Sequence, residues 1–464
     1  MNAIAMHAAY LLAGASVALP LAGAALTAGL RKWLSRTVAD LLGITLAALA
    51  LGVDTLLLYS ALQGGFVAWF GNWFPRGSMV VGIGFVVEPI GAGMAVLAAL
   101  LTLLALIFSW KEVGSGANYF QPLMLVFLAA MSGFVLTSDI FNLFVFFELM
   151  STAAFALCGL KTAEPAPLQG AFNFAVTNTI AAFLVLSGVG ILYAMTGALN
   201  MAQIGLALGT RHDPLVLFAC TLLTCGFLVK GAIVPFHLWL PDAHAVAPTP
   251  VCVLFSGLMV ELGLFAVMRL QSVVFGETFI SHPSALRNIL ASFAIATVLL
   301  GSVMCYAEHH LKRLLAFSTI SHAGLMLLAF SMGGATAVAA MLTYLLAHAF
   351  IKSSLFFHVG HDAAPLPLNQ RKDSVPARAR LLVDSGVVVP RRRRTCCGSA
   401  VDDVYRRSGS LAPIRTSRLP RRLLAISLRR RDDRCGRLPR RHACVLWLGR
   451  RTDHGPGSRC RRAA

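Results

Sequence analysis

Charged side chains are scarce in this sequence, and their scarcity excludes an ordinary soluble domain. Only 13% of the 464 residues are charged, whereas 57% are hydrophobic. Soluble domains carry about a quarter charged residues. Long apolar runs recur through residues 1–360, each near the roughly 20 residues that cross a bilayer as a helix. The alternation of apolar and polar residues that a strand requires is absent from these runs, so they predict helices.

Cysteine pairs and cofactor motifs are also missing. Neither the cysteines before residue 361 nor those after it include a C-x-x-C pair or another metal-ligand spacing. No glycine fingerprint for a dinucleotide and no haem motif is present. We therefore expect no disulfide framework, no catalytic residue, no cofactor and no metal site, and an enzyme acting alone is disfavoured. The cysteines in or beside apolar segments are expected to behave as small hydrophobic residues, and they are Cys158, Cys220, Cys225, Cys252 and Cys305.

Phenylalanine, methionine and glutamate are absent after residue 360, where the composition changes abruptly. Residues 1–360 carry 13 Lys and Arg against 12 Asp and Glu, whereas residues 361–464 carry 26 against 8. This tail has a single lysine, Lys372, and four consecutive arginines at 391–394. GC-rich DNA read in a wrong frame encodes an amino-acid composition of this kind, so we interpret the tail as the product of a frameshift near codon 360.

A genuine basic tail is the alternative, and it raises the question of nucleic-acid binding. Beyond its charge, the tail offers only Tyr405 and Trp447 as aromatic residues. Proteins that bind single strands rely on several aromatic platforms for base stacking. We therefore expect no nucleic-acid partner.

Eleven membrane-spanning segments can be drawn in the first 360 residues, and they predict an all-α, polytopic transmembrane bundle. With the N-terminus outside, the inner loops receive seven Lys and Arg and the outer loops four. Positive charge favours cytoplasmic loops, so we expect a multi-pass protein of the inner (plasma) membrane with its N-terminus outside. The segments are 6–30, 38–62, 86–109, 121–138, 140–160, 171–196, 214–235, 248–270, 286–306, 313–332 and 335–358.

Six titratable residues inside these segments are functional candidates, because a charge at this depth costs several kcal/mol. The charge on a nearby carboxylate changes how firmly a buried lysine holds its proton. Glu148 and Lys230 form such a switch if their helices pack together. Mere neutralisation of charge between helices is the alternative, but the number of these residues favours a proton relay. The six are Glu148, Lys230, Glu261, His322, His348 and Lys352.

A run of prolines follows Lys230. Proline removes a backbone donor and breaks helices, and broken helices at membrane depth line cavities or sites. We therefore expect a broken helix here. His237, Asp242 and His244 lie in the same stretch, but no further ligand completes a metal coordination sphere. The prolines are Pro235, Pro241, Pro248 and Pro250.

The stretch from Lys230 to Pro250 reads KGAIVPFHLWLPDAHAVAPTP and resembles the signature of the proton-conducting antiporter-like membrane subunits. That family includes the large pumping subunits of complex I, the D-type subunit of Mrp cation/proton antiporters and counterparts in membrane-bound hydrogenases. The likeness covers roughly residues 80–360. Three more stretches are similar to the family: DIFNLFVFFELM at 139–150, LKRLLAFSTISH at 311–322 and LAHAFIKSSLF at 346–356.

This resemblance implies a role for each titratable residue. Glu148 matches the family's fifth-helix glutamate, and Lys230 matches the seventh-helix lysine that pairs with it. His322 and His348 match histidines of a polar axis through the middle of the membrane, and Lys352 matches a basic position of the eleventh helix. The resemblance also implies two inverted repeats, each with a broken helix, in a core of about 14 helices.

Two departures from the family pattern stand out. Glu261 occupies the place where many members have an eighth-helix lysine, which inverts the charge of the central relay step. In addition, Arg-rich sequence replaces the last helices of the family core, with the exit half-channel. The chain as given is therefore not expected to pump, and its tail is expected to be disordered.

These observations divide the chain into three parts. Residues 1–110 are N-terminal transmembrane helices, residues 111–360 are the antiporter-like proton-translocation core with its second repeat incomplete, and residues 361–464 are the Arg-rich tail. The expected function is proton translocation within a multisubunit redox complex, resembling NADH:quinone oxidoreductase or a hydrogenase. An Mrp-type Na⁺/H⁺ antiporter component and a non-functional truncated member are the alternatives. The expected partners are other membrane subunits, the lipid bilayer, protons and, in the antiporter case, Na⁺.

Sequencing the coding DNA across codons 350–370 tests the frameshift. We expect another downstream frame to encode apolar helices with a buried charged residue, because the helical pattern stops where the composition changes. If no frame reads this way, the Arg-rich tail is genuine.

Overall fold

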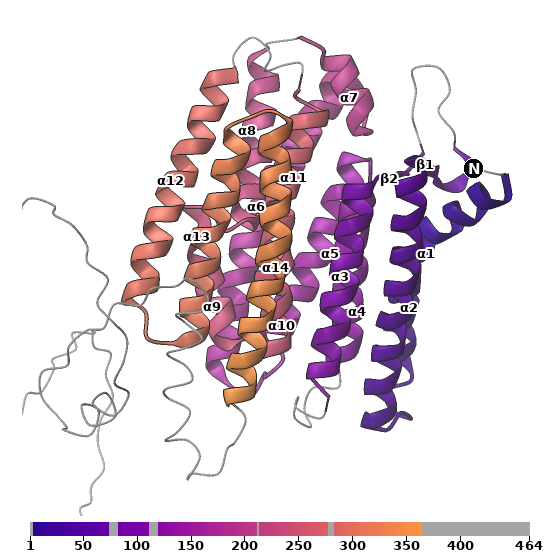
Figure 1. Ribbon diagram of the computed structural model, residues 1–464, viewed down its shortest axis with the longest axis vertical. Helices are drawn as coiled ribbons and strands as arrows, with labels where there is room; N and C mark the ends of the chain where they lie inside the picture. Colours follow the sequence, from indigo (N-terminus) through magenta and orange to yellow (C-terminus); the bar gives the residue numbers. More distant parts are fainter. Residues whose placement is uncertain (1–2, 74–81, 111–118, 211–212, 277–282, 364–464) are drawn as a thin grey trace, which may run out of the picture. The chain divides into compact units, whose positions relative to one another are not determined.

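The computed structural model describes residues 3–73, 82–110, 119–210, 213–276 and 283–363 (Figure 1). All of them belong to the first of the two units, 1–391 and 392–464, into which the chain divides. The prediction for the tail at 361–464 therefore lies almost entirely outside the described residues.

Helices dominate the described residues and run side by side along the molecule, as Figure 1 shows. The longer ones are α1 (Ala3–Gly29), α2 (Arg36–Gln63), α3 (Pro89–Phe108), α4 (Phe120–Leu136), α5 (Ile140–Cys158), α6 (Pro165–Thr196), α8 (Pro214–Lys230), α11 (Val260–Val273), α12 (Pro283–Ala307), α13 (Leu311–Ser331) and α14 (Ala335–Ala363). The shorter ones are α7 (Met201–Leu208), α9 (Trp239–Val246) and α10 (Thr249–Leu254), with 3-10 turns at Phe70–Asn72 and Phe236–Leu238.

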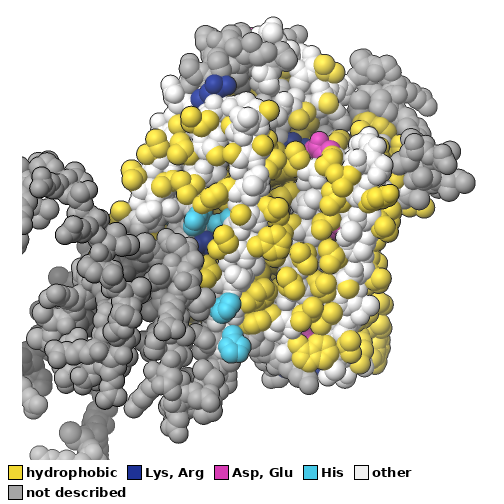
Figure 2. All heavy atoms as spheres, in the orientation of Figure 1, with side chains coloured by type: hydrophobic (Ala, Val, Ile, Leu, Met, Phe, Trp, Pro, Cys, Tyr) yellow, Lys and Arg dark blue, Asp and Glu magenta, His cyan; other side chains and the backbone are white. Residues whose placement is uncertain are grey.

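Nine helices among the described residues are long and apolar enough to cross a membrane. Two further apolar helices, Phe120–Leu136 and Pro214–Lys230, occupy the remaining two of the eleven predicted segments. The prediction of an all-α, polytopic transmembrane bundle is therefore confirmed. Figure 2 shows the apolar surface expected of such a bundle, with hydrophobic side chains spread over the visible face.

Local sequence signals explain where several helices begin and end. The side chains of Asp139 and Asn200 accept hydrogen bonds from the first turns of α5 and α7, and so cap backbone N–H groups that have no partner within the helix. Pro89, Pro165 and Pro214 open α3, α6 and α8, where a missing N–H is harmless.

A small β-hairpin departs from the sequence prediction. Strands β1 (Phe66–Trp69) and β2 (Gly84–Val87) pair antiparallel, with Phe66 opposite Val87. The predicted third segment began at residue 86, but the helix begins at Pro89 because proline suits only the first turn of a helix. Four-residue strands are too short to show an alternating pattern, which is why the sequence indicated helices alone.

The centre of the bundle is the span Thr249–Val273, which is buried throughout the window that defines it. It consists of α10, a π-helical stretch at Phe255–Met259, and α11. α10 packs on α3 and α14, and α11 packs on α8 and α13. The span is therefore enclosed by other helices, which makes it the scaffold for the buried polar groups.

Close packing of α8 on α11 depends on Gly263. A Cβ atom at this position meets the backbone nitrogen of Gly231 at 2.6 Å and the carbonyl oxygen of Phe227 at 2.8 Å. Backbone atoms cannot rotate away, so Gly263→Ala has to push the two helices apart. We expect this change to lower the free energy of unfolding in detergent micelles by about 1–3 kcal/mol.

Gly93→Ala is the matched control, because a Cβ on this α3 glycine meets nothing within 4 Å. Alanine favours a helix over glycine by about 0.5–1 kcal/mol, so this variant should be neutral or slightly stabilised. Equal stability of the two variants would contradict the packing argument.

Candidate functional site: two buried lysine clusters

The first cluster surrounds Lys230, the last residue of α8, whose side chain is fully buried. Its ammonium nitrogen donates to the Ser151 hydroxyl at 2.8 Å and to the Asn178 amide oxygen at 3.3 Å. The same nitrogen lies 5.0 Å from the ring centre of Phe147 and 5.8 Å from that of Phe174. α5 and α6 supply these groups, so the direct partners of Lys230 are neutral.

Glu148 approaches this cluster without touching the ammonium group. It lies on α5 one turn before Ser151, and no ion pair within 4 Å joins it to Lys230 among the described residues. The two side chains still interact electrostatically, and the Glu148 Oε1 atom has no hydrogen-bond partner in the described part of the chain. The expected pairing is therefore indirect, with the Ser151 hydroxyl as the group that contacts the lysine.

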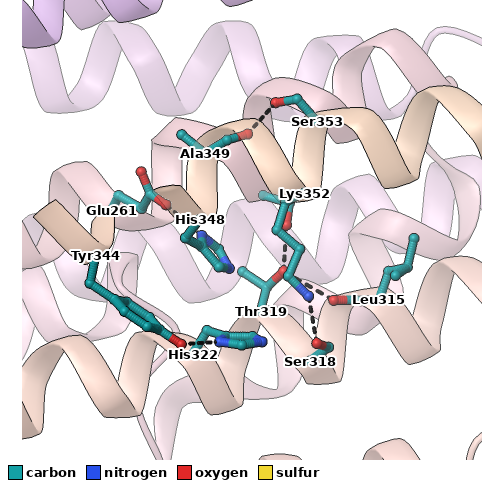
Figure 3. Close-up of polar contacts among 11 residues, drawn as sticks. Glu261, Leu315, Ser318, Thr319, His322, Tyr344, His348, Ala349, Lys352 and Ser353 are labelled. Carbon is teal, nitrogen blue, oxygen red and sulfur yellow. Dashed lines mark hydrogen bonds and ion pairs between the residues drawn. The ribbon is translucent and has the colours of Figure 1, made fainter. Parts of the chain in front are cut away.

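The second cluster is built on α11, α13 and α14 (Figure 3). Glu261 of α11 and His348 of α14 are both buried, and the Glu261 Oε1 and His348 Nδ1 atoms lie 2.5 Å apart. His348 also faces His322 of α13, with 5.2 Å between the ring centres. The buried Glu261 carboxylate therefore has a direct imidazole partner.

Tyr344 and Lys352 complete this cluster from the same face of α14, one turn before and one turn after His348. The Tyr344 hydroxyl and the His322 Nδ1 atom lie 2.5 Å apart, and the Lys352 ammonium donates to the Ser318 hydroxyl at 2.5 Å. Figure 3 shows both contacts, together with Thr319 one residue further along α13. Thr319 is hydrogen-bonded to Ser256 in the π-helical stretch.

Several of these residues were missed in the sequence. The sequence could have indicated Tyr344, because it precedes His348 by four residues and so lies on the same helix face. The same spacing links His348 to Lys352. Ser151, Asn178 and Ser318 carried none, because polar residues of this size are common in membrane helices and only the folded chain brings them to a lysine.

The helix break between the clusters follows the proline run. After α8 ends at Lys230, the chain forms the 3-10 turn and then α9, with Pro235 before the turn and Pro241 in the first turn of α9. Pro248 and Pro250 flank the start of α10. Trp239 of α9 donates its ring N–H to the carbonyl of Val229 at 2.9 Å, which fixes the break against the end of α8.

Ion pairs and a hydrogen bond connect the helix break to the beginning of α13. Arg313 pairs with Asp242 of α9 at 3.3 Å and with Glu308 at 3.2 Å, and Lys312 donates to the carbonyl of Ala247 at 2.9 Å. Partial burial raises the pKa of Glu308, but hydrogen bonds from the backbone of His310 and His309 and the charge of Arg313 outweigh it and lower that pKa. Glu308 therefore stays ionised opposite Arg313.

Buried atoms without partners recur along these clusters. Besides Glu148 Oε1, the Oε2 atom of Glu261, the Nε2 atom of His348 and both ring nitrogens of His244 have no hydrogen-bond partner among the described residues. Buried polar atoms are nearly always hydrogen-bonded to protein or to water. Groups that can each hold or release a proton, and that lie within hydrogen-bond contact of one another, can pass a proton from one to the next. Within the described ranges, no group of three or more His, Cys, Asp or Glu is placed to hold a metal ion.

Comparison with known proteins agrees with this architecture. The family model described as "NADH:quinone oxidoreductase/Mrp antiporter, TM" matches residues 137–364. The N-type subunit of the NADH-quinone oxidoreductase of Desulforudis audaxviator is 33% identical over 318 residues, which cover 66% of this chain and 62% of that protein. The D-type subunit of the Na⁺/H⁺ antiporter of Alkalihalophilus pseudofirmus is 29% identical over 322 residues, which cover 68% and 62%.

A solved structure shares the fold. A chain of the membrane-bound sulfane sulfur reductase, an archaeal respiratory membrane complex, superposes with a TM-score of 0.74 at 26% identity, covering 82% of this chain and 78% of that one. The class defined by the fold and the buried polar clusters is therefore a polytopic membrane subunit. The chain belongs to the antiporter-like family of membrane subunits found in NADH:quinone oxidoreductases and Mrp antiporters. It spans 62% of the length of each of the two curated relatives named above.

The Glu261–His348 contact can be tested by two substitutions. Glu261→Gln keeps an oxygen that accepts a hydrogen bond, whereas Glu261→Leu leaves the buried Nδ1 atom of His348 without its partner. Leaving a buried polar atom without its partner costs about 1–3 kcal/mol, so we expect the Leu variant to unfold more easily in detergent than the Gln variant. Equal stability of the two variants would show that the contact contributes nothing.

Proposed function

We propose that this chain is a proton-translocating subunit of a multisubunit membrane redox complex. The observation that carries this proposal is the pair of fully buried lysines, Lys230 and Lys352. Each is hydrogen-bonded to a serine hydroxyl and, among the described residues, makes no direct contact with a carboxylate. A lysine with a neutral partner can lose its proton without leaving a buried carboxylate unpaired, whereas a lysine locked in an ion pair cannot. Both lysines are therefore suited to load and unload protons.

Glu148 is the group suited to control Lys230. It acts on the lysine by charge alone, since Ser151 and Asn178 supply the direct contacts. Protonating or ionising Glu148 changes the electrostatic energy of the ammonium group while its hydrogen bonds stay in place. Proton transfer at Lys230 is thereby coupled to the charge state of a neighbouring helix.

Protons would pass through the second cluster by way of imidazoles. The Glu261–His348 contact and the contact between Tyr344 and His322 join three helices, and the two rings lie 5.2 Å apart at their centres. A neutral imidazole accepts a proton on one nitrogen and donates from the other, so the pair His322 and His348 suits relay. Glu261 here accepts or releases a proton where many family members use a lysine.

The energy for translocation comes, in this proposal, from partner subunits, because the sequence carries no cofactor motif of its own. Relatives whose names include NADH-quinone oxidoreductase and sulfane sulfur reductase support a redox partner. The relative named for a Na⁺/H⁺ antiporter supports the second candidate, a subunit that exchanges protons with Na⁺. We place the protein in the plasma membrane with its N-terminus outside, on the distribution of Lys and Arg among the loops.

Proton flux in membrane vesicles tests this function. Glu148→Gln and Lys230→Ala should each abolish proton-coupled transport while leaving membrane insertion intact, because each removes a charge on which the relay depends. The same two changes should also be made in a gene whose reading frame is restored after codon 360, so that the relay is tested in both forms of the protein. Retained transport in both variants would overturn the relay, and no transport in either parent protein would overturn the function.

A further inference from the structure

A cavity of about 540 Å³ lies at one end of the bundle, outside both lysine clusters. It is formed where α11 ends at Val273, α12 begins at Pro283, α13 ends at Ser331 and α14 begins at Ala335. Figure 1 shows these ends of α12, α13 and α14 at the top of the bundle. Binding sites for small molecules have volumes of about 300–1,000 Å³, so the cavity is large enough to hold a ligand.

Arg287 supplies the charge of this cavity. Among the described residues that line it, Arg287 alone has a charged side chain, which is exposed and makes no ion pair within 4 Å with any of them. Two other polar lining residues already use their donors. The Gln271 amide donates to the Thr224 hydroxyl at 3.3 Å, and the Ser331 hydroxyl donates to the Leu328 carbonyl at 2.7 Å. The guanidinium is therefore the strongest donor that the cavity offers to a ligand.

The turn between α13 and α14 makes room for this guanidinium. A Cβ atom at Gly333 would lie 2.4 Å from the Cζ and Nη2 atoms of Arg287, so the guanidinium lies directly against this glycine. Gly333 and its neighbour Gly334 have φ angles of 76° and 85°, which glycine adopts without a steric penalty. A side chain at position 333 would push the guanidinium out of its place beside the cavity.

The remaining wall of the cavity is largely apolar. Leu290 follows Arg287 by three residues on α12, so it lies on the same helix face and further from the helix end. A charged group at the helix ends, with an apolar wall beside it, matches the order of the phosphate and the acyl chains in a phospholipid. The apolar lining residues, all buried or partly buried, are Phe275, Leu286, Leu290, Phe330 and Val338.

We propose that this cavity binds an anionic phospholipid, with the lipid phosphate on the Arg287 guanidinium and the beginning of an acyl chain along the apolar wall. The planar fork of N–H groups in arginine matches two phosphate oxygens. No Asp or Glu is among the described lining residues, so the ammonium group of a zwitterionic lipid finds no carboxylate there. A free phosphate ion offers the same oxygens but leaves the apolar wall uncovered. The site is independent of proton translocation, and its test needs no flux measurement.

Native mass spectrometry of the full chain in detergent, titrated with phosphatidylglycerol, tests the site. Arg287→Gln removes the charge, and Gly333→Ala keeps the arginine but displaces its guanidinium. We expect each variant to bind the lipid at least about tenfold more weakly than the parent protein, because a charge-assisted contact is lost.

Two control variants separate this contact from strain and from net charge. Gly334→Ala adds a methyl group at a similarly positive φ, but its Cβ meets nothing within 4 Å. Lys161→Gln removes one positive charge from an exposed residue that does not line the cavity. We expect both controls to bind phosphatidylglycerol as the parent protein does.

Two further ligands identify the source of the phosphate. Phosphatidylcholine should bind more weakly than phosphatidylglycerol, and inorganic phosphate at the same concentration should not displace the lipid. Equal binding of the two lipids would overturn the selection by charge, and displacement by phosphate would show that the site takes a free ion. Unchanged binding in Arg287→Gln would overturn the site itself. An equal loss in Gly333→Ala and Gly334→Ala would show that backbone strain, and not the position of the guanidinium, controls binding.

Discussion

The buried ammonium groups of Lys230 and Lys352 impose the constraint on which the rest of the bundle depends. An ammonium group removed from water needs hydrogen-bond acceptors, and each missing acceptor costs free energy. Both lysines are held by hydroxyl groups from neighbouring helices, Ser151 for Lys230 and Ser318 for Lys352. The packing of α5 against α6, and of α6 against α8, therefore has to place a serine and an amide within reach of one nitrogen.

Small residues make that placement possible. Gly263 brings α11 against the backbone of α8, and a Cβ on Gly257 would meet the Ser353 hydroxyl at 2.7 Å. Helices in lipid gain little from burying apolar side chains against one another, so close backbone contact at small residues supplies much of their association. The polar groups thus lie where the helices are closest, and any widening of these contacts would separate hydrogen-bond partners first.

The sequence predicted the bundle well because hydrophobic length is a local property. All eleven segments correspond to helices, and the six titratable residues lie on five of these helices, with Lys230 at the end of α8. The partners could not be predicted in the same way. The rotation of each helix about its own axis decides which side chains meet. It brings Ser151 and not Glu148 to Lys230, and it brings Glu261 to His348. Helices with apolar residues on every face do not specify this rotation. α9 was also missed as a helix, because prolines on both sides obscure eight residues of regular structure.

The π-helical stretch at Phe255–Met259 changes the direction in which the side chains after it point. A π-turn contains one residue more than an α-turn, and each residue of an α-helix advances by about 100° around the axis. Side chains after the stretch are therefore rotated relative to those before it. Ser256 is hydrogen-bonded to Thr319 on α13, while Glu261 contacts His348 on α14. A single additional residue per turn thus acts as a phase shift, and the direction in which Glu261 faces α14 depends on the stretch that precedes it.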